Sequence, residues 1–291
     1  MMRHIRQLLI LILVLVISSC AFFDMRELRR VEGIGLEIQD QFNSADVASI
    51  VATFSVARFS KRLGYSFRDL PNDFKREGYQ FFHQIFADEV KGIVNALAMN
   101  DLSINFLEAH KKDGVYRLNY EISVLKNGEP YVTNFLVIYL QQDSNEEFKI
   151  VNLYNLQSGF SMGQIGKNNV NDMLTRKNSE SYTPQANLLR SFAIKDEAQK
   201  KLAYGDAMGA YNLIETIPKS LQDAPRLAAW RLYLASQINE KLYRDNLVRM
   251  KSISPNKQSI KFYDCQILGI DRDSTATQVC YDELYEMLFE M

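Results

Sequence analysis

Residues 113–141, DGVYRLNYEISVLKNGEPYVTNFLVIYLQ, contain the pattern that decides the fold. Apolar and polar residues alternate along much of this stretch, as in a β-strand with one buried face. Asp113-Gly114 and Asn127-Gly128 interrupt the alternation, and both dipeptides favour a type I′ hairpin turn, whose two central residues need positive φ. We therefore expect an antiparallel meander. Its four strands are predicted over residues 102–110, 115–125, 131–141 and 148–157.

The turn at Asn127-Gly128 also predicts the register of the two central strands. If the turn has two residues, the numbers of facing residues add up to 255. One face of the hairpin then carries pairs of apolar or aromatic residues, which stabilise a sheet. These pairs are Tyr116 with Tyr139, Leu118 with Val137, Tyr120 with Phe135 and Val124 with Tyr131.

The other face of the predicted sheet mixes polar and apolar residues. If it is covered, Asn119, Glu121, Asn134 and Asn155 become polar groups in a largely apolar concavity, which is how a small-ligand pocket is usually lined. These four residues are our candidate pocket. The alternative is that the polar strand, with Arg117 and its neighbours, lies at a solvated edge of the sheet.

Helices are expected before the meander. Apolar residues recur at helical spacing over residues 44–61, where Ser44 or Asn43 can cap the start, and Pro71 opens a second helix with a broad apolar face that extends to Leu97. Helices followed by a long curved meander that ends at Phe148–Gly159 resemble the cone-shaped α+β fold of the nuclear-transport-factor-like superfamily, over about residues 33–166. The resemblance implies an isomerase, a hydrolase or a non-catalytic binding domain. Asn152 stands where related domains often carry an acid, which favours binding.

The last third of the chain is predicted to be all-helical. The polar residues 175–184 form the expected linker between an α+β domain over residues 33–174 and a helical domain over residues 185–291. Breaks at short intervals indicate about six helices in three antiparallel hairpins. The stretch Tyr204–Pro218 resembles the junction and second helix of a tetratricopeptide repeat, which implies a concave surface that binds peptides or helices. Hairpins stacked for stability alone are the alternative.

Two cysteines are placed opposite each other by this helical prediction. Cys265 and Cys280 are symmetric about the loop at residues 271–274, so they face each other in an antiparallel hairpin. An oxidising compartment favours a disulfide between them. Two buried thiols are the alternative.

The N-terminus carries an export signal. Arg3 and Arg6 precede ten apolar residues, which are too few to span a membrane, and small residues follow. The run Ile17-Ser18-Ser19-Cys20 resembles the lipobox of bacterial lipoproteins, which implies removal of a signal peptide over residues 1–19 and lipidation of Cys20. Ala21 in place of Asp implies the outer membrane, facing the periplasm. Residues 20–32 are then the lipidated cysteine and a linker or first helix. An ordinary secretory cleavage is the alternative.

Composition narrows the function classes. The chain of 291 residues has 34 Lys plus Arg against 35 Asp plus Glu, so it lacks the basic excess of a nucleic-acid binder. Gly159, Gly163, Gly166 and Lys167 fail the spacing of a nucleotide-binding loop. Only His83 and His110 remain after the signal peptide, which argues against a zinc site.

We therefore expect no cofactor, metal, nucleotide or nucleic acid as a partner. The predicted function is that of a lipid-anchored periplasmic adaptor that engages a protein or peptide through its helical hairpins. A small-ligand binder or sensor that uses the cone is the alternative, and an isomerase or hydrolase in the same cone is the third hypothesis.

Overall fold

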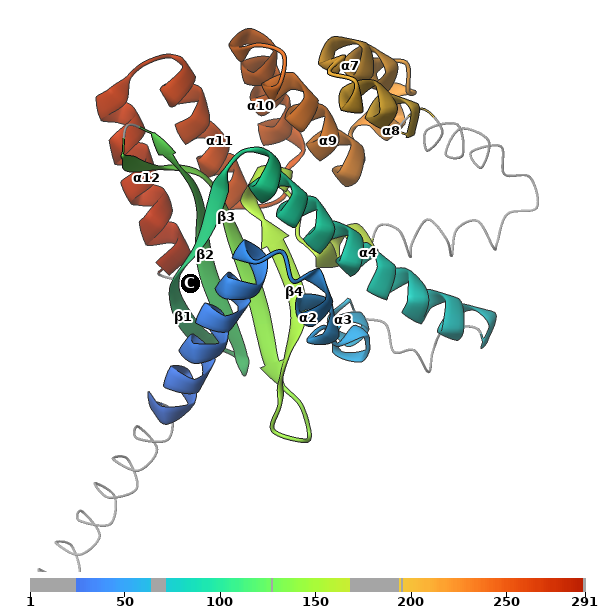
Figure 1. The fold of residues 1–291 in the computed structure, drawn as a ribbon, viewed down its shortest axis with the longest axis vertical. Helices are drawn as coiled ribbons and strands as arrows, with labels where there is room; N and C mark the ends of the chain where they lie inside the picture. Colours follow the sequence, from blue (N-terminus) through green and yellow to red (C-terminus); the bar gives the residue numbers. More distant parts are fainter. Residues whose placement is uncertain (1–24, 64–71, 127, 168–193, 195, 290–291) are drawn as a thin grey trace, which may run out of the picture.

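A computed structural model describes residues 25–63, 72–126, 128–167, 194 and 196–289, and it shows a mixed α+β fold (Figure 1). Four antiparallel strands form one sheet in the order β1-β2-β3-β4, which confirms the predicted meander. Their bounds are β1 (Leu102–Lys112), β2 (Val115–Lys126), β3 (Glu129–Gln142) and β4 (Phe148–Asn155). A helical region follows the sheet. The predicted lipobox with Cys20 and the predicted linker at residues 175–184 lie outside the described residues.

The turn between β1 and β2 has the predicted conformation, with φ of 52° at Asp113 and 72° at Gly114. The register between β2 and β3 follows the prediction only beside the second turn. A β-bulge then places Ser123 opposite Val132 but Ile122 opposite Asn134, so that all later pairs are shifted by one residue.

The shift changes which side chains share a face, because neighbouring residues of a strand point to opposite faces. The predicted pairs of Tyr116, Leu118 and Tyr120 are therefore wrong. Their partners are Leu140, Ile138 and Leu136, and together these six residues lie on what we call the first face of the sheet. Phe135, Val137 and Tyr139 lie on the opposite, second face.

Helices from the N-terminal part of the chain cover the first face. They are a helix over residues 25–43, α2 (Val47–Ala52), α3 (Val56–Arg62) and α4 (Asn72–Met99). Buried apolar side chains from these helices and from the first face form one core, with Phe54 and Phe86 stacked at 4.1 Å between ring centroids.

The prediction of one helix over residues 44–61 is wrong, because the helix is interrupted between α2 and α3. Phe54 forms a bridge with Ile150 of β4, and the backbone of Ser55 donates a hydrogen bond to the carbonyl of Ile150 at 2.9 Å. The side chain of Ser55 then caps α3, while Asp46 caps α2. Asn43, expected as a helix cap, instead bonds the backbone of Ile104 through both its amide nitrogen and its oxygen.

The helical region follows the sheet. Its elements are a helix over residues 196–203, α7 (Ala207–Glu215), α8 (Lys219–Gln222), α9 (Pro225–Ser236), α10 (Glu240–Ile253), α11 (Lys257–Ile270) and α12 (Ser274–Phe289). The helix over 196–203 and α7 share a small core with Leu234 of α9.

The second face of the sheet is covered by this helical region. In Figure 1 the red helices α11 and α12 lie along the sheet, and the C-terminal end of α12 lies over β1 and β2. A single core joins both parts of the chain. It contains Phe135, Val137 and Tyr154 of the sheet together with Phe262, Leu284 and Leu288 of the helices.

Candidate functional site

The four residues of the candidate pocket lie on two different faces of the sheet. Asn119 and Glu121 project from the second face, whereas Asn134 and Asn155 have the strand positions of Leu136 and Leu153 on the first face. The sequence prediction that they share one concavity is therefore wrong, and its cause is the bulge between β2 and β3. Nor is β2 a solvated edge, since it lies between β1 and β3 and Asn119 is 1% exposed.

Asn134 and Asn155 fix the end of β4. The side-chain amide of Asn134 donates to the side-chain oxygen of Asn155 at 2.8 Å. The backbone N–H of Gln157 donates to both side-chain oxygens, at 3.1 and 3.0 Å. These bonds satisfy the backbone N–H of Gln157 in the turn that follows β4, and they give both asparagines a structural role.

Asn119 and Glu121 contact the C-terminal helix α12 instead of an open pocket. The Asn119 amide donates to the backbone carbonyl of Leu288 at 3.2 Å, and the Tyr285 hydroxyl donates to the Glu121 carboxylate at 2.9 Å. Burial and the neighbouring carboxylate of Glu121 raise the pKa of Tyr285, so it stays a neutral donor. The polar groups of Asn119 and Glu121, where we expected a ligand, are therefore taken up by α12 of the same chain.

A Glu–His pair lies beside Asn119 on the second face. A bulge in β1 places Glu108 opposite Asn119 and His110 opposite Arg117. The Glu108 carboxylate contacts the His110 ring and accepts a 3.5 Å hydrogen bond from Asn119, and the ring of Phe289 lies 6.5 Å from the His110 ring. Within the described residues, His110 has no hydrogen bond to a hydroxyl or thiol that it could activate as a nucleophile.

Polar side chains also hold the helical region against the end of β4. The hydroxyl groups of Tyr154 and Ser259 lie 2.5 Å apart, and Ser259 donates onward to the carbonyl of Leu156 at 2.7 Å. Burial raises the pKa of Tyr154. Gly159 has a φ of 74°, and a Cβ there would lie 2.5 Å from the Tyr263 hydroxyl. The contact between the helical region and the end of β4 therefore depends on the close approach of Tyr263 to Gly159 as well as on hydrogen bonds.

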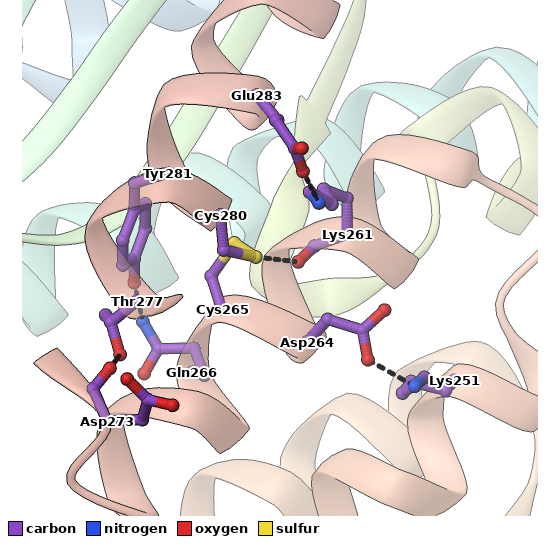
Figure 2. Close-up of a disulfide and its surroundings, with 10 residues drawn as sticks. All are labelled: Lys251, Lys261, Asp264, Cys265, Gln266, Asp273, Thr277, Cys280, Tyr281 and Glu283. Carbon is purple, nitrogen blue, oxygen red and sulfur yellow. Dashed lines mark hydrogen bonds and ion pairs between the residues drawn. A yellow bond between two sulfur atoms is a disulfide. The ribbon is translucent and has the colours of Figure 1, made fainter. Parts of the chain in front are cut away.

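Cys265 and Cys280 form a disulfide between α11 and α12, with their Cα atoms 5.4 Å apart (Figure 2). Both cysteines are buried in the core that the helices share with the sheet. Figure 2 also shows the Lys261–Glu283 ion pair and the 2.6 Å hydrogen bond from Gln266 to Tyr281, which join the same two helices. The bridge thus stabilises the hairpin that covers the second face.

The first helical hairpin exposes apolar side chains to solvent. Tyr204, in the turn before α7, is 90% exposed, and Met208 in the first turn of α7 is 47% exposed. Asp206 caps α7 by accepting a 2.8 Å hydrogen bond from the backbone of Gly209. Gly205 provides the required positive φ, 81°. Tyr204 and Met208 are therefore exposed on a turn that the Asp206 cap and the positive φ of Gly205 stabilise.

No helix in the described ranges combines the length and the apolar character needed to cross a membrane. The same part of the chain contains no group of three or more His, Cys, Asp or Glu side chains arranged to hold a metal ion. Comparisons with protein-family models, with curated proteins and with solved structures find no significant match to this chain.

Proposed function

We propose that the protein is a lipid-anchored adaptor of the bacterial cell envelope. In this proposal the signal peptide over residues 1–19 is removed, Cys20 is acylated, and the mature protein faces the periplasm from the outer membrane. The α+β part is a nuclear-transport-factor-like domain, and the helical part is a tetratricopeptide-like array that engages a protein or peptide partner.

The observation that carries the proposal is the occupied second face of the sheet. Residues of α12 take up the hydrogen-bonding groups of Asn119 and Glu121. In a small-ligand binder or an isomerase that used this cone, those groups would face the ligand. The sheet here supports the helical region, and this arrangement favours recognition by the helices.

The exposed pair Tyr204 and Met208 is the part of the helical region that we assign to the partner. Tyrosine and methionine are enriched at protein interfaces, where a large side chain adds contact area at low entropic cost. The pair belongs to the hairpin with the small separate core, so contact there leaves the core beneath the sheet unchanged.

Photo-crosslinking in cells tests this assignment. We would incorporate p-benzoylphenylalanine at position 204 or 208, and at Leu36 as a matched control, since Leu36 is an apolar residue that is 52% exposed on the N-terminal helix. We expect positions 204 and 208 to capture the same discrete partner, absent from the control. Identical products from all three positions, or none from 204 and 208, would contradict the assignment.

Metabolic labelling with palmitate tests the anchor separately. We expect the wild-type protein to incorporate label in the outer-membrane fraction and the Cys20→Ala variant to incorporate none. Label retained by Cys20→Ala would refute lipidation at this residue, whatever the crosslinking shows.

A further inference from the structure

A row of side chains crosses the second face of the sheet at one end. His110 of β1 lies opposite Arg117 of β2, Arg117 opposite Tyr139 of β3, and Tyr139 opposite Asn152 of β4. Three of these four side chains can donate hydrogen bonds through nitrogen, and the fourth is an aromatic ring. The sequence pattern placed Tyr139 on the other face, so this row follows only from the shifted register.

Arg117 is a buried cation without an anionic partner. Its side chain is 7% exposed, and its Nε is buried without a hydrogen-bond acceptor. In the described part of the chain no carboxylate lies within ion-pair distance of it, and its contact is with the ring of Tyr139, whose centroid is 5.8 Å from the guanidinium carbon. Burying a charge costs free energy unless the charge is paired, so an anion near Arg117 would stabilise this arrangement.

A second guanidinium approaches the same ring. The guanidinium carbon of Arg62, at the end of α3, lies 5.5 Å from the Tyr139 centroid. Arg62 likewise has no ion pair among the described residues. The two guanidinium groups give this end of the sheet a positive potential, which favours an anion nearby.

The row ends at a pocket of about 240 Å³ between α3, β4 and the chain after β4. Arg62 and Lys167 contribute positive charge to its wall. Asn152 also lines it, and its side-chain oxygen accepts a 2.9 Å hydrogen bond from the backbone of Gly163, which fixes the direction of its amide donor. The remaining lining residues divide into a polar group, Ser161 and Gln164, and an apolar group, Phe59, Leu63 and Val151.

We propose that this pocket binds a small organic oxyanion, a carboxylate or a phosphate ester, that carries an apolar substituent. Arg62 and Lys167, the two cations of its wall, bind the oxyanion, because a guanidinium matches carboxylate and phosphate geometry and an ammonium pairs with either. Arg117 does not line the pocket and adds positive potential from the neighbouring row. Phe59, Leu63 and Val151 contact the apolar part. The pocket is smaller than the roughly 300–1,000 Å³ that accommodates drug-sized molecules, so the substituent is about the size of one aromatic ring. This site is independent of the proposed adaptor function, and neither requires the other.

Calorimetric titration of the purified full-length protein in detergent tests the site. The probes are benzoate, phenyl phosphate and inorganic phosphate, each up to about 10 mM, with the neutral benzyl alcohol as a control for the apolar contact alone. We expect benzoate or phenyl phosphate to bind with one-to-one stoichiometry, and more tightly than inorganic phosphate or benzyl alcohol. The preferred probe distinguishes a carboxylate ligand from a phosphate ester.

Variants assign the binding to Arg62 and Lys167. Arg62→Met and Lys167→Met should each weaken binding at least about tenfold, since each removes a charge-assisted hydrogen bond from the pocket wall. Arg117→Met should weaken binding less, because Arg117 does not line the pocket. Arg58→Met is the matched control, a cation one turn earlier on α3 that does not line the pocket, and its affinity should equal that of the wild type. Arg117→Met should also melt at the same or a higher temperature, because methionine replaces an unpaired buried charge.

Three results would overturn the proposal. The first is the absence of binding by any of the three anions. The second is an equal loss of affinity in Arg58→Met, which would mean that the anions respond to net charge. The third is an Arg62→Met protein that binds as the wild type does, which would assign Arg62 to its contact with the ring of Tyr139.

Discussion

Two glycines of the N-terminal helix should respond differently to the same substitution. A Cβ at Gly33 would meet nothing within 4 Å, whereas a Cβ at Gly35 would lie 2.6 Å from the ring of Phe106. That ring cannot easily move, because it packs edge-on against Tyr120 at 5.5 Å, and the Tyr120 hydroxyl donates to the carbonyl of Gly35 at 3.1 Å. Gly35 therefore permits the close approach of this helix to the sheet.

The expected change in the free energy of unfolding of each variant follows from two contributions. Alanine in place of glycine within a helix stabilises it by about 1 kcal/mol, and this gain applies to both positions. An added methyl group in a packed core costs about 1–3 kcal/mol, and this cost applies only at Gly35. We therefore expect Gly33→Ala to stabilise the protein by about 1 kcal/mol, and Gly35→Ala to be less stable than Gly33→Ala by about 1–3 kcal/mol.

Guanidinium denaturation followed by circular dichroism measures both variants. The difference between their midpoints, at equal m-values, isolates the steric cost because the helix-propensity gain is common to both. In thermal melts the two variants should differ by at least about 2 °C. If both variants are stabilised equally, the N-terminal helix does not approach Phe106 as described, and the reasoning is refuted.

Three further predictions concern the helical region. Reduction of the Cys265–Cys280 disulfide, which closes a loop of 15 residues, should lower the free energy of unfolding by about 3 kcal/mol, and an unchanged denaturation midpoint in reductant would count against a stabilising bridge. Hydrogen bonds hold the pKa of Asp206 below its usual value, so its contribution to stability should be present above about pH 4 and lost as the pH falls through the folded-state pKa. The stability difference between wild type and Asp206→Ala should therefore shrink on acidification, and a constant difference from pH 7 to pH 3 would contradict this. Tyr285→Phe removes the donor to Glu121 and should destabilise the protein by about 1 kcal/mol, while Glu121→Gln, which keeps an acceptor, should cost less; equal losses would contradict the assigned hydrogen bond.

The local features of the sheet could be predicted from the sequence, whereas the assignment of side chains to its faces could not. Turn dipeptides and alternation act within a few residues, and they correctly placed the strands and the Asp113-Gly114 turn. The bulge opposite Ile122 has no glycine or proline to mark it. A bulge of one residue exchanges the faces of everything beyond it, and the candidate pocket failed for that reason.

Long-range contacts explain the remaining differences between the predicted and the observed structure. The apolar spacing of residues 44–61 fits one helix, but the bridge between Phe54 and Ile150 competes with it, and no local pattern reports that contact. The sequence of α12 does contain a pattern that indicates that this helix covers the second face. Cys280, Leu284 and Leu288 form one stripe at a spacing of four residues, and Tyr281, Tyr285 and Phe289 form an adjacent one. A helix with two neighbouring apolar stripes packs against two partners, here α11 and the sheet.

The contact between Asn119 and Leu288 has a consequence for the order of folding. The two residues are 169 positions apart, and the second face of the sheet cannot be fully covered before α12 has been synthesised. Until then Phe135 lacks its contact with Tyr285 and part of the second face is exposed to solvent, and such surfaces are recognised by chaperones and proteases. Completion of the core is therefore a late event, and chains that lack α12 should be short-lived in the cell.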